Sequence, residues 1–343
     1  MKNALTVILA VFIFGALILI HELGHYIFAR IFRVGIKEFS IGMGPKIFSK
    51  KSKKTGISYS LRLFPIGGYV AMIGEDGGCE EDGALCSKPK WQRAIVLAAG
   101  SAMNIVLGFI LMISYVISAP AIGSTTVAGF SEGALSQQSG LMVDDEIISV
   151  AGHKVHLLYD LSYAISDYGQ NPVDITVLRN GEKITLEKVS FPVTEEKGIK
   201  FGEQDFLVKR VEKNVKNVLY CSYHQSVATL KMIYSSLGDL ITGRYGLEAV
   251  SGPVGMTTAI GEVANTGVVN LLLFVAMITV NLGIFNLLPF PALDGGRILF
   301  LIIEAIRKKP VKPEIEGAIN FAGLALLLFF SVFIAIKDVI GLL

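Results

Sequence analysis

Charged residues are scarce in this chain. Only 17% of its 343 residues are Asp, Glu, Lys or Arg, whereas 52% are hydrophobic, and an average soluble protein carries about 25% charged residues. This shortage argues against an ordinary soluble enzyme. The 31 basic and 29 acidic residues leave a net charge of +2, which lacks the excess of Lys and Arg expected of a nucleic-acid binder. We therefore expect no nucleic-acid partner.

Cysteine is also scarce. The chain has three cysteines, Cys79, Cys86 and Cys221. An odd number cannot all pair within one chain, and none of the spacings is the C-x-x-C of a metal site. We expect free thiols.

Four uncharged stretches account for the missing charge. A helix needs about 20 apolar residues to cross a hydrocarbon core of about 30 Å. The stretches are residues 4–20, 94–118, 263–293 and 317–336. The first continues with helical character beyond His21 and lacks a convincing cleavage site, so we expect a retained helix at about residues 4–30 rather than a signal peptide. The fourth stretch reads as a plain spanning helix, and the lipid bilayer is the expected environment.

The distribution of basic residues predicts the orientation of these helices. Twelve Lys or Arg residues lie between the first two spans and five between the last two, whereas each terminal tail carries one. Short basic loops stay in the cytoplasm, so both termini should be extracytoplasmic. The stretch from about residue 119 to 262 is too long to follow this rule and should be an exported domain.

The exported stretch has a β-rich pattern. Alternating residues at 173–179 and 183–187 flank Asn180-Gly181, which favours a type I′ turn because both turn residues need a positive φ. Upstream, residues 139–152 resemble a stretch common in bacterial PDZ domains, with Asp144 where that pattern usually has glycine. We assign a PDZ-like domain to residues 122–193.

The most informative motif is His21-Glu22-Leu23-Gly24-His25. Residues four apart share one face of a helix, so both imidazoles can bind one Zn²⁺ ion at about 2.1 Å. Three ionisable side chains at the end of an apolar helix are costly to place in a membrane, so a functional site is the first interpretation. The alternative is an interfacial position in which the histidines only reach toward the lipid headgroups.

A catalytic zinc needs one more protein ligand, and Asp294 is the candidate. It ends the third uncharged stretch, and the first and third helices should both run toward the cytoplasm, so Asp294 and the two histidines should lie at similar depth. Pro289 and Pro291 should break the third helix, while Gly295 and Gly296 would permit a tight turn. Asp294 could instead cap a helix beside Arg297.

This set of residues predicts peptide-bond hydrolysis within the membrane or at its edge. A zinc ion with an open position lowers the pKa of a bound water toward about 7 and polarises a carbonyl group. Glu22 adjoins a ligand without being one. It would take the water proton and pass it to the leaving amine.

Two motifs together carry a family resemblance. H-E-L-G-H in a first membrane helix, N-x-x-P-x-P-x-L-D-G-G in the third, and a PDZ-like insert between the second and third resemble the site-2 protease family of intramembrane zinc metalloproteases, in its bacterial type with one PDZ domain. The resemblance covers almost the whole chain. It implies that His21, His25 and Asp294 hold Zn²⁺ and that Glu22 is the catalytic base.

The resemblance also implies a location and substrates. The location is the bacterial cytoplasmic membrane, with the active site toward the cytoplasm and the PDZ-like domain outside. The substrates are transmembrane segments of single-pass proteins, such as anti-sigma factors after a first cut, and remnants of signal peptides. The PDZ-like domain would act as a docking site or a size filter.

A second part of the resemblance concerns substrate binding. Residues 57–63 alternate, and residues 64–72 turn and return as a second strand. This pair resembles the membrane-reentrant β-hairpin of the family, whose edge binds substrate by strand addition. A peripheral hairpin that covers the site is the alternative. The substrate-binding residues implied are Gly67, Gly68, Tyr69, Asn286, Pro289 and Pro291.

The predicted fold class is a polytopic α-helical membrane protein with about four transmembrane helices, a membrane-reentrant β-hairpin and an inserted α+β PDZ-like domain. Residues 1–121 hold the first two helices and the reentrant loop, residues 122–193 the PDZ-like domain, residues 194–262 a linker or amphipathic segment, and residues 263–343 the last two helices. Two other functions fit part of the pattern. A metal transporter or sensor would leave Glu22 unused, and an inactive PDZ scaffold would not need the H-E-x-x-H motif.

Overall fold

The computed structural model describes residues 2–75, 79–196, 199–243, 246 and 250–342. The chain divides into two compact units, which are described separately below. The first consists of Met1–Gly108 and Glu248–Leu343, and the second of Phe109–Leu247.

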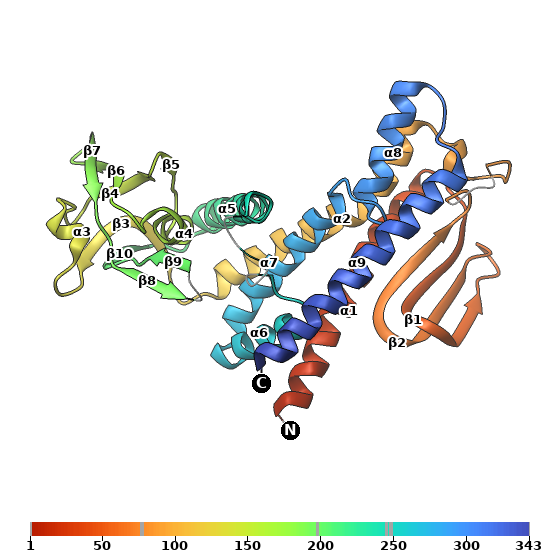
Figure 1. Cartoon of the computed structure of the whole chain (residues 1–343), viewed down its shortest axis with the longest axis horizontal. Coiled ribbons are helices and arrows are strands. Elements are labelled where there is room, and N and C mark those ends of the chain that lie inside the picture. The colour runs from red at the N-terminus through yellow and green to blue at the C-terminus, as the bar shows by residue number, and fades with distance from the viewer. Residues whose placement is uncertain (1, 76–78, 197–198, 244–245, 247–249, 343) are drawn as a thin grey trace. The chain divides into compact units, whose positions relative to one another are not determined.

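Four helices in the described part of the chain are long and apolar enough to cross a membrane. They are α1 (Lys2–Ile31), α2 (Lys90–Ser118), α7 (Val268–Leu287) and α9 (Pro313–Leu342). The protein is therefore a polytopic membrane protein, as predicted. The beginning of α1 and the end of α9 lie near the same end of the first unit (Figure 1), as an even number of crossings requires.

The third uncharged stretch is divided into several elements. The short helix α6 (Pro253–Thr266) ends at Gly267, and α7 begins immediately after it. As predicted, α7 ends before Pro289. Gly295 and Gly296, for which a tight turn was expected, lie instead in the first turn of α8 (Asp294–Arg307). A Cβ on Gly295 would lie 2.2 Å from the carbonyl oxygen of Leu288, so glycine here lets α8 start directly against the end of α7.

The first unit also contains a small antiparallel sheet made of two long strands, β1 (Ile36–Lys51) and β2 (Ser58–Met72) (orange in Figure 1). Residues 36–41 of β1 pair with 68–72 on one side and with 58–61 on the other. The predicted pairing of residues 57–63 with 64–72 was therefore wrong, because β1 lies between them. The strand β1 was not predicted, because its alternation is interrupted by Gly42, Gly44 and Pro45. Residues 68–72 form an edge of this sheet.

The second unit is built on a six-stranded sheet. Its strands are β3 (Ile122–Phe130), β4 (Glu146–Val150), β5 (His153–Lys154), β6 (Val173–Arg179), β7 (Glu182–Val189) and β10 (Phe206–Val211), in the order β10-β3-β4-β6-β7 with β5 beside β4. The remaining elements are α3 (Leu135–Gln138), α4 (Leu158–Tyr168), the hairpin of β8 (Val193–Glu196) and β9 (Ile199–Gly202), and α5 (Val215–Thr242). Leu161 and Ile165 of α4 are buried in one core with Ile147, Ile175 and Val177 of the sheet.

Two turns of the second unit follow the sequence closely. Asn180 and Gly181 have φ values of 52° and 86° and join β6 to β7, which confirms the predicted hairpin turn. Asp144 has a φ of 73°, a left-handed conformation that glycine adopts more readily. This explains why the resembling pattern usually has glycine at that position.

The cysteines differ from the sequence expectation. Cys79 and Cys86 form a disulfide, with Cα atoms 5.5 Å apart, so the expectation of free thiols was wrong for this pair. The amide of Leu85 donates to the carbonyl of Ile73, and this bond folds the segment back on itself. Cys221 is free and buried, as expected.

Candidate metal centre

Three of the predicted residues meet at one point of the first unit. Asp294 Oδ2 lies 3.2 Å from His21 Nε2 and 3.3 Å from His25 Nε2, and the two Nε2 atoms are 3.2 Å apart. Ligands bound at about 2.1 Å to a tetrahedral zinc ion lie about 3.4 Å from one another. The three atoms are therefore spaced as ligands of one zinc ion would be.

The local folding of two helices brings these three candidate ligands together. His21 and His25 share one face of α1 because they are four residues apart, and both are buried. Asp294 is the first residue of α8, immediately after the break that follows α7. A carboxylate is favoured at this end of a helix by the helix dipole. Its Oδ2 atom is buried and accepts no hydrogen bond within the described residues, as suits an atom that faces a cation.

Helix α2 packs against the part of α1 that carries the histidines. His25 Nδ1 donates a hydrogen bond of 2.8 Å to the carbonyl oxygen of Val96, so in a neutral ring Nε2 is the unprotonated atom that could bind a metal. A Cβ on Gly24 would lie 2.4 Å from the carbonyl oxygen of Ala99. The two helix backbones therefore touch at this level, and small residues permit this approach.

A second polar group of α2 reaches the other histidine. Asn104 is fully buried, and its Nδ2 atom lies 3.4 Å from His21 Nδ1, while its Oδ1 atom has no partner in the described residues. When Nε2 of His21 faces a metal, the hydrogen of the neutral ring is on Nδ1. Rotation of the amide by 180° would bring Oδ1 into position to accept that hydrogen.

The predicted base lies next to the predicted substrate edge. Glu22 is half-buried on α1, and a Cβ on Gly68 would lie 3.5 Å from Glu22 Cγ. The same Cβ would lie only 2.8 Å from the carbonyl oxygen of Ser40, so no larger residue fits there without a shift of the strand. The edge of β2 therefore passes directly beside Glu22.

The other predicted substrate residues are divided between two elements. Gly67 precedes the edge and has a φ of 90°. The side chain of Tyr69 accepts a hydrogen bond from Arg62, whose guanidinium carbon lies 4.9 Å from the centre of the tyrosine ring. Asn286 lies in the last turn of α7, and Pro289 and Pro291 lie in the loop between α7 and α8.

A polar cluster holds the sheet of β1 and β2 together away from the candidate ligands. Glu38 accepts hydrogen bonds from Lys46 at 2.9 Å, from Arg62 at 3.0 Å and from Ser60. Burial alone would raise the pKa of Glu38, but the hydrogen bonds from Ser60, Lys46 and Arg62 prevail and lower its pKa to about 2. The carboxylate of Glu38 therefore stays charged and ties three segments of the sheet together.

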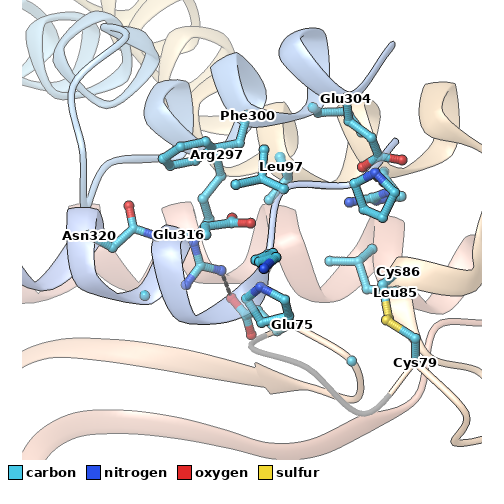
Figure 2. Close-up of a pocket in the computed structure, with 18 residues that line it drawn as sticks. Glu75, Cys79, Leu85, Cys86, Leu97, Arg297, Phe300, Glu304, Glu316 and Asn320 are labelled. Atoms are coloured by element: carbon cyan, nitrogen blue, oxygen red, sulfur yellow. Dashed lines mark hydrogen bonds and ion pairs between the residues drawn. A yellow bond between two sulfur atoms is a disulfide. The ribbon is translucent and has the colours of Figure 1, made fainter. Parts of the chain in front are cut away.

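The first unit contains a cavity of about 540 Å³, lined by residues of the β2–α2 connection, α2, α8, the α8–α9 connection and α9; Figure 2 draws these lining residues. Arg297, the residue considered as a partner of Asp294, points toward Glu75 in the segment after β2 and forms an ion pair with it. Arg93 of α2 forms an ion pair of 2.9 Å with Glu304 of α8. These pairs link α8 to α2 and to the segment that follows β2.

Several residues of the centre were not assigned by the sequence analysis. The contact of Val96 with His25 involves a backbone carbonyl, and it could not be predicted from the sequence because every residue has this group. The position of Gly68 beside Glu22 depends on a strand pairing that was predicted wrongly. Asn104 was not assigned to the site, and the signal that points to it in the sequence is an amide side chain within an otherwise apolar helix.

The class of protein now follows from the fold and from comparison with known proteins. The sequence model of "Peptidase family M50" matches residues 9–330. A Fusobacterium nucleatum protein, named by prediction as a zinc metalloprotease, is 35% identical over 351 residues, with 98% of both chains covered. The protein is thus a membrane-embedded zinc metalloprotease. It belongs to peptidase family M50, the site-2 protease family.

Two further relatives carry more specific names. The "Regulator of sigma-W protease RasP" of Bacillus subtilis is 30% identical over 418 residues, covering 97% of this chain and 98% of its own. The "Zinc metalloprotease RasP" of Bacillus licheniformis is 30% identical over 422 residues with the same coverage.

Proposed function

We propose that this protein cuts transmembrane segments of single-pass membrane proteins, with His21, His25 and Asp294 as its zinc ligands and Glu22 as its general base. The observation that carries the proposal is the convergence of the three ligand atoms at 3.2–3.3 Å, with the β2 edge beside Glu22. A bound zinc ion would acidify a water molecule and polarise the carbonyl group of the scissile bond. Proton transfer and substrate binding would be carried out by side chains and backbone groups of this chain.

Glu22 handles the proton. As a carboxylate next to the ligands, it would take a proton from the attacking water and deliver it to the nitrogen of the leaving amine. A general base of this kind contributes about 10²- to 10⁴-fold to the rate. A transporter or an intramembrane metal sensor would need the three ligands but would have no use for this carboxylate.

The edge of β2 is the proposed substrate partner. A helix in lipid has all its backbone hydrogen bonds satisfied internally, so it must unwind before it can be cut. The unwound segment regains partners by adding as a strand to residues 68–72, which are paired with β1 on one side only among the described residues. Because Gly68 has no side chain, the added strand can pass close to Glu22. Tyr69 would contribute its backbone groups to this edge, and Gly67 would do so just before it, in a hairpin that reenters the membrane.

The loop after α7 would complete the substrate site. Asn286 has an amide side chain that can hydrogen-bond to an unwound backbone, and Pro289 and Pro291 keep the loop from continuing the helix. We assign these three residues to holding substrate near the metal.

We further propose an orientation in which both termini and the PDZ-like domain at residues 122–193 are extracytoplasmic, while the metal centre is toward the cytoplasm of a bacterial cell. The distribution of basic residues supports this orientation. In it, the PDZ-like domain meets the exported part of a substrate and restricts cleavage to proteins already shortened by a first cut. Anti-sigma factors and remnant signal peptides are the substrate classes proposed.

The experiment that tests this proposal compares cells that carry the wild-type enzyme with cells that carry Glu22→Gln. We expect purified Glu22→Gln to keep one zinc ion per chain. In cells that carry this variant, membrane fragments of single-pass proteins that the enzyme has not cut should accumulate. Cleavage at the wild-type rate would eliminate Glu22 as the base. Zinc uptake that depends on His21 but not on Glu22 would favour a transporter, and absence of any accumulating fragment would favour an inactive scaffold.

A further inference from the structure

The loop that carries Asp294 has an unfavourable backbone conformation. Ala292, two residues before Asp294, has a φ of 72°. A residue with a Cβ disfavours this left-handed region, because the Cβ comes too close to the following carbonyl oxygen. Such a conformation persists only where the surroundings hold it, and it determines the direction in which the chain enters α8.

One side chain of α9 holds this residue. The amide nitrogen of Ala292 donates a hydrogen bond of 3.1 Å to Oδ1 of Asn320. Figure 2 shows Asn320 on its helix at the edge of the 540 Å³ cavity. Asn320 is the sole amide side chain in an uncharged stretch, residues 317–336, that otherwise reads as a plain spanning helix.

The backbone of α9 touches the same loop one turn later. A Cβ on Gly323 would lie 2.5 Å from Pro291 Cβ and 2.8 Å from the carbonyl oxygen of Pro291. Asn320 and Gly323 are three residues apart and share one face of α9. Helix and loop are therefore in direct contact where the hydrogen bond forms, so a shift of the loop would have to break both contacts.

From these contacts we infer that Asn320 is a positioning residue for the metal centre: it holds Ala292 in the left-handed conformation and thereby directs Asp294 toward His21 and His25. This inference rests on the proposed role of Asp294 as a zinc ligand. It gives the fourth membrane helix a part in metal binding, although α9 supplies no ligand.

The test measures zinc affinity rather than proteolysis. Apo-protein of the full chain in detergent micelles is titrated with Zn²⁺ against a chelator, and the visible absorption of the Co²⁺-substituted protein reports the ligand set. The variants are Asn320→Leu, which removes the acceptor, and Asn320→Asp, which keeps an oxygen at that place. Phe321→Leu is the matched control, because the neighbouring Phe321 side chain is 74% exposed.

We expect Asn320→Leu to bind zinc about 10- to 100-fold more weakly, as loss of partners around metal ligands typically does, and to show an altered Co²⁺ spectrum. Asn320→Asp and Phe321→Leu should stay within about threefold of the wild type. Adding Ala292→Gly to Asn320→Leu should recover part of the affinity, because glycine adopts a positive φ without the steric cost. This recovery also separates positioning from a general loss of folding.

Two results would overturn the inference. One is an Asn320→Leu variant with wild-type zinc affinity and Co²⁺ spectrum. The other is an equal loss of zinc affinity in Asn320→Leu and Asn320→Asp, with no recovery when Ala292→Gly is added to Asn320→Leu. This result would indicate that Asn320 has a packing role only. Asp294→Asn is measured alongside. If Asp294→Asn binds zinc normally, the proposed ligand is wrong, whereas normal binding by Asn320→Leu alone rejects only the positioning role.

Discussion

Gly100 of α2 faces His25 of α1 so closely that a Cβ on Gly100 would lie 2.4 Å from His25 Nε2. The same Cβ would lie 2.8 Å from His21 Nε2. Both atoms are proposed zinc ligands, so the absence of a side chain at residue 100 keeps the space in which they converge. Helix α2 supplies no proposed ligand, but the missing side chain at Gly100 leaves room for the two histidines.

Gly100→Ala should therefore impair metal binding. The added methyl group must displace one or both imidazoles, and we expect the affinity for zinc to fall about tenfold or more, as for other disturbances around metal ligands. Zinc content after dialysis against a weak chelator measures this loss. Gly108→Ala is the control on the same helix: its Cβ would meet Val280 Cγ2 at 2.4 Å, so it should cost about 1–3 kcal/mol of stability by overpacking without a specific loss of zinc. Equal zinc retention in the two variants would contradict the prediction.

Asn104→Leu should weaken zinc binding through His21. Removal of the amide leaves His21 Nδ1 without its buried partner, and we expect about a 10- to 100-fold loss of affinity. Ser101→Ala is the control one turn earlier, because the buried Ser101 hydroxyl has no partner in the described residues and its removal should leave affinity unchanged. Chelator competition on the apo-proteins measures both. If Ser101→Ala lowered affinity as much as Asn104→Leu, the effect would come from helix packing instead.

Glu38 should make the stability of the sheet depend on acid pH. Its pKa is about 2 in the folded protein, below the ordinary value of 4.5, so folding stabilises the charged form. This contribution is fully present above about pH 4.5 and is lost as the pH falls through about 2. Thermal unfolding of the wild type and of Glu38→Gln in micelles should therefore differ most above pH 4.5 and converge toward pH 2. A difference in Tm that does not change over this range would show that the carboxylate is not held by Lys46 and Arg62.

The disulfide between Cys79 and Cys86 provides a test of orientation. Thiols in the cytoplasm are kept reduced, so the proposed cytoplasmic placement predicts that this pair is reduced in growing cells and closes only under oxidising conditions. A polyethylene glycol maleimide added after acid quenching should shift the mass of a Cys221→Ser variant by two additions. Protection of both thiols until a reductant is added would place this loop outside and reverse the proposed orientation.

The sequence by itself determined the class of this protein. Runs of about 20 uncharged residues have few stable alternatives to spanning a bilayer, and two histidines four residues apart share a helix face wherever that helix lies. The four spans and the candidate ligands were therefore readable from local patterns. The turn at Asn180-Gly181 was readable for the same reason, since its conformation depends on two adjacent residues.

Only the tertiary structure decided what surrounds the ligands. That Gly68 lies beside Glu22, that Gly100 leaves room for His25, and that Asn320 holds Ala292 all depend on contacts between segments far apart in the chain. The hairpin predicted between residues 57–63 and 64–72 was wrong for this reason: both segments pair with β1 instead, and strand alternation indicates a strand without identifying its partner. Local periodicity indicates which face of a helix or strand is apolar. Which other element packs against that face depends on how the whole chain folds.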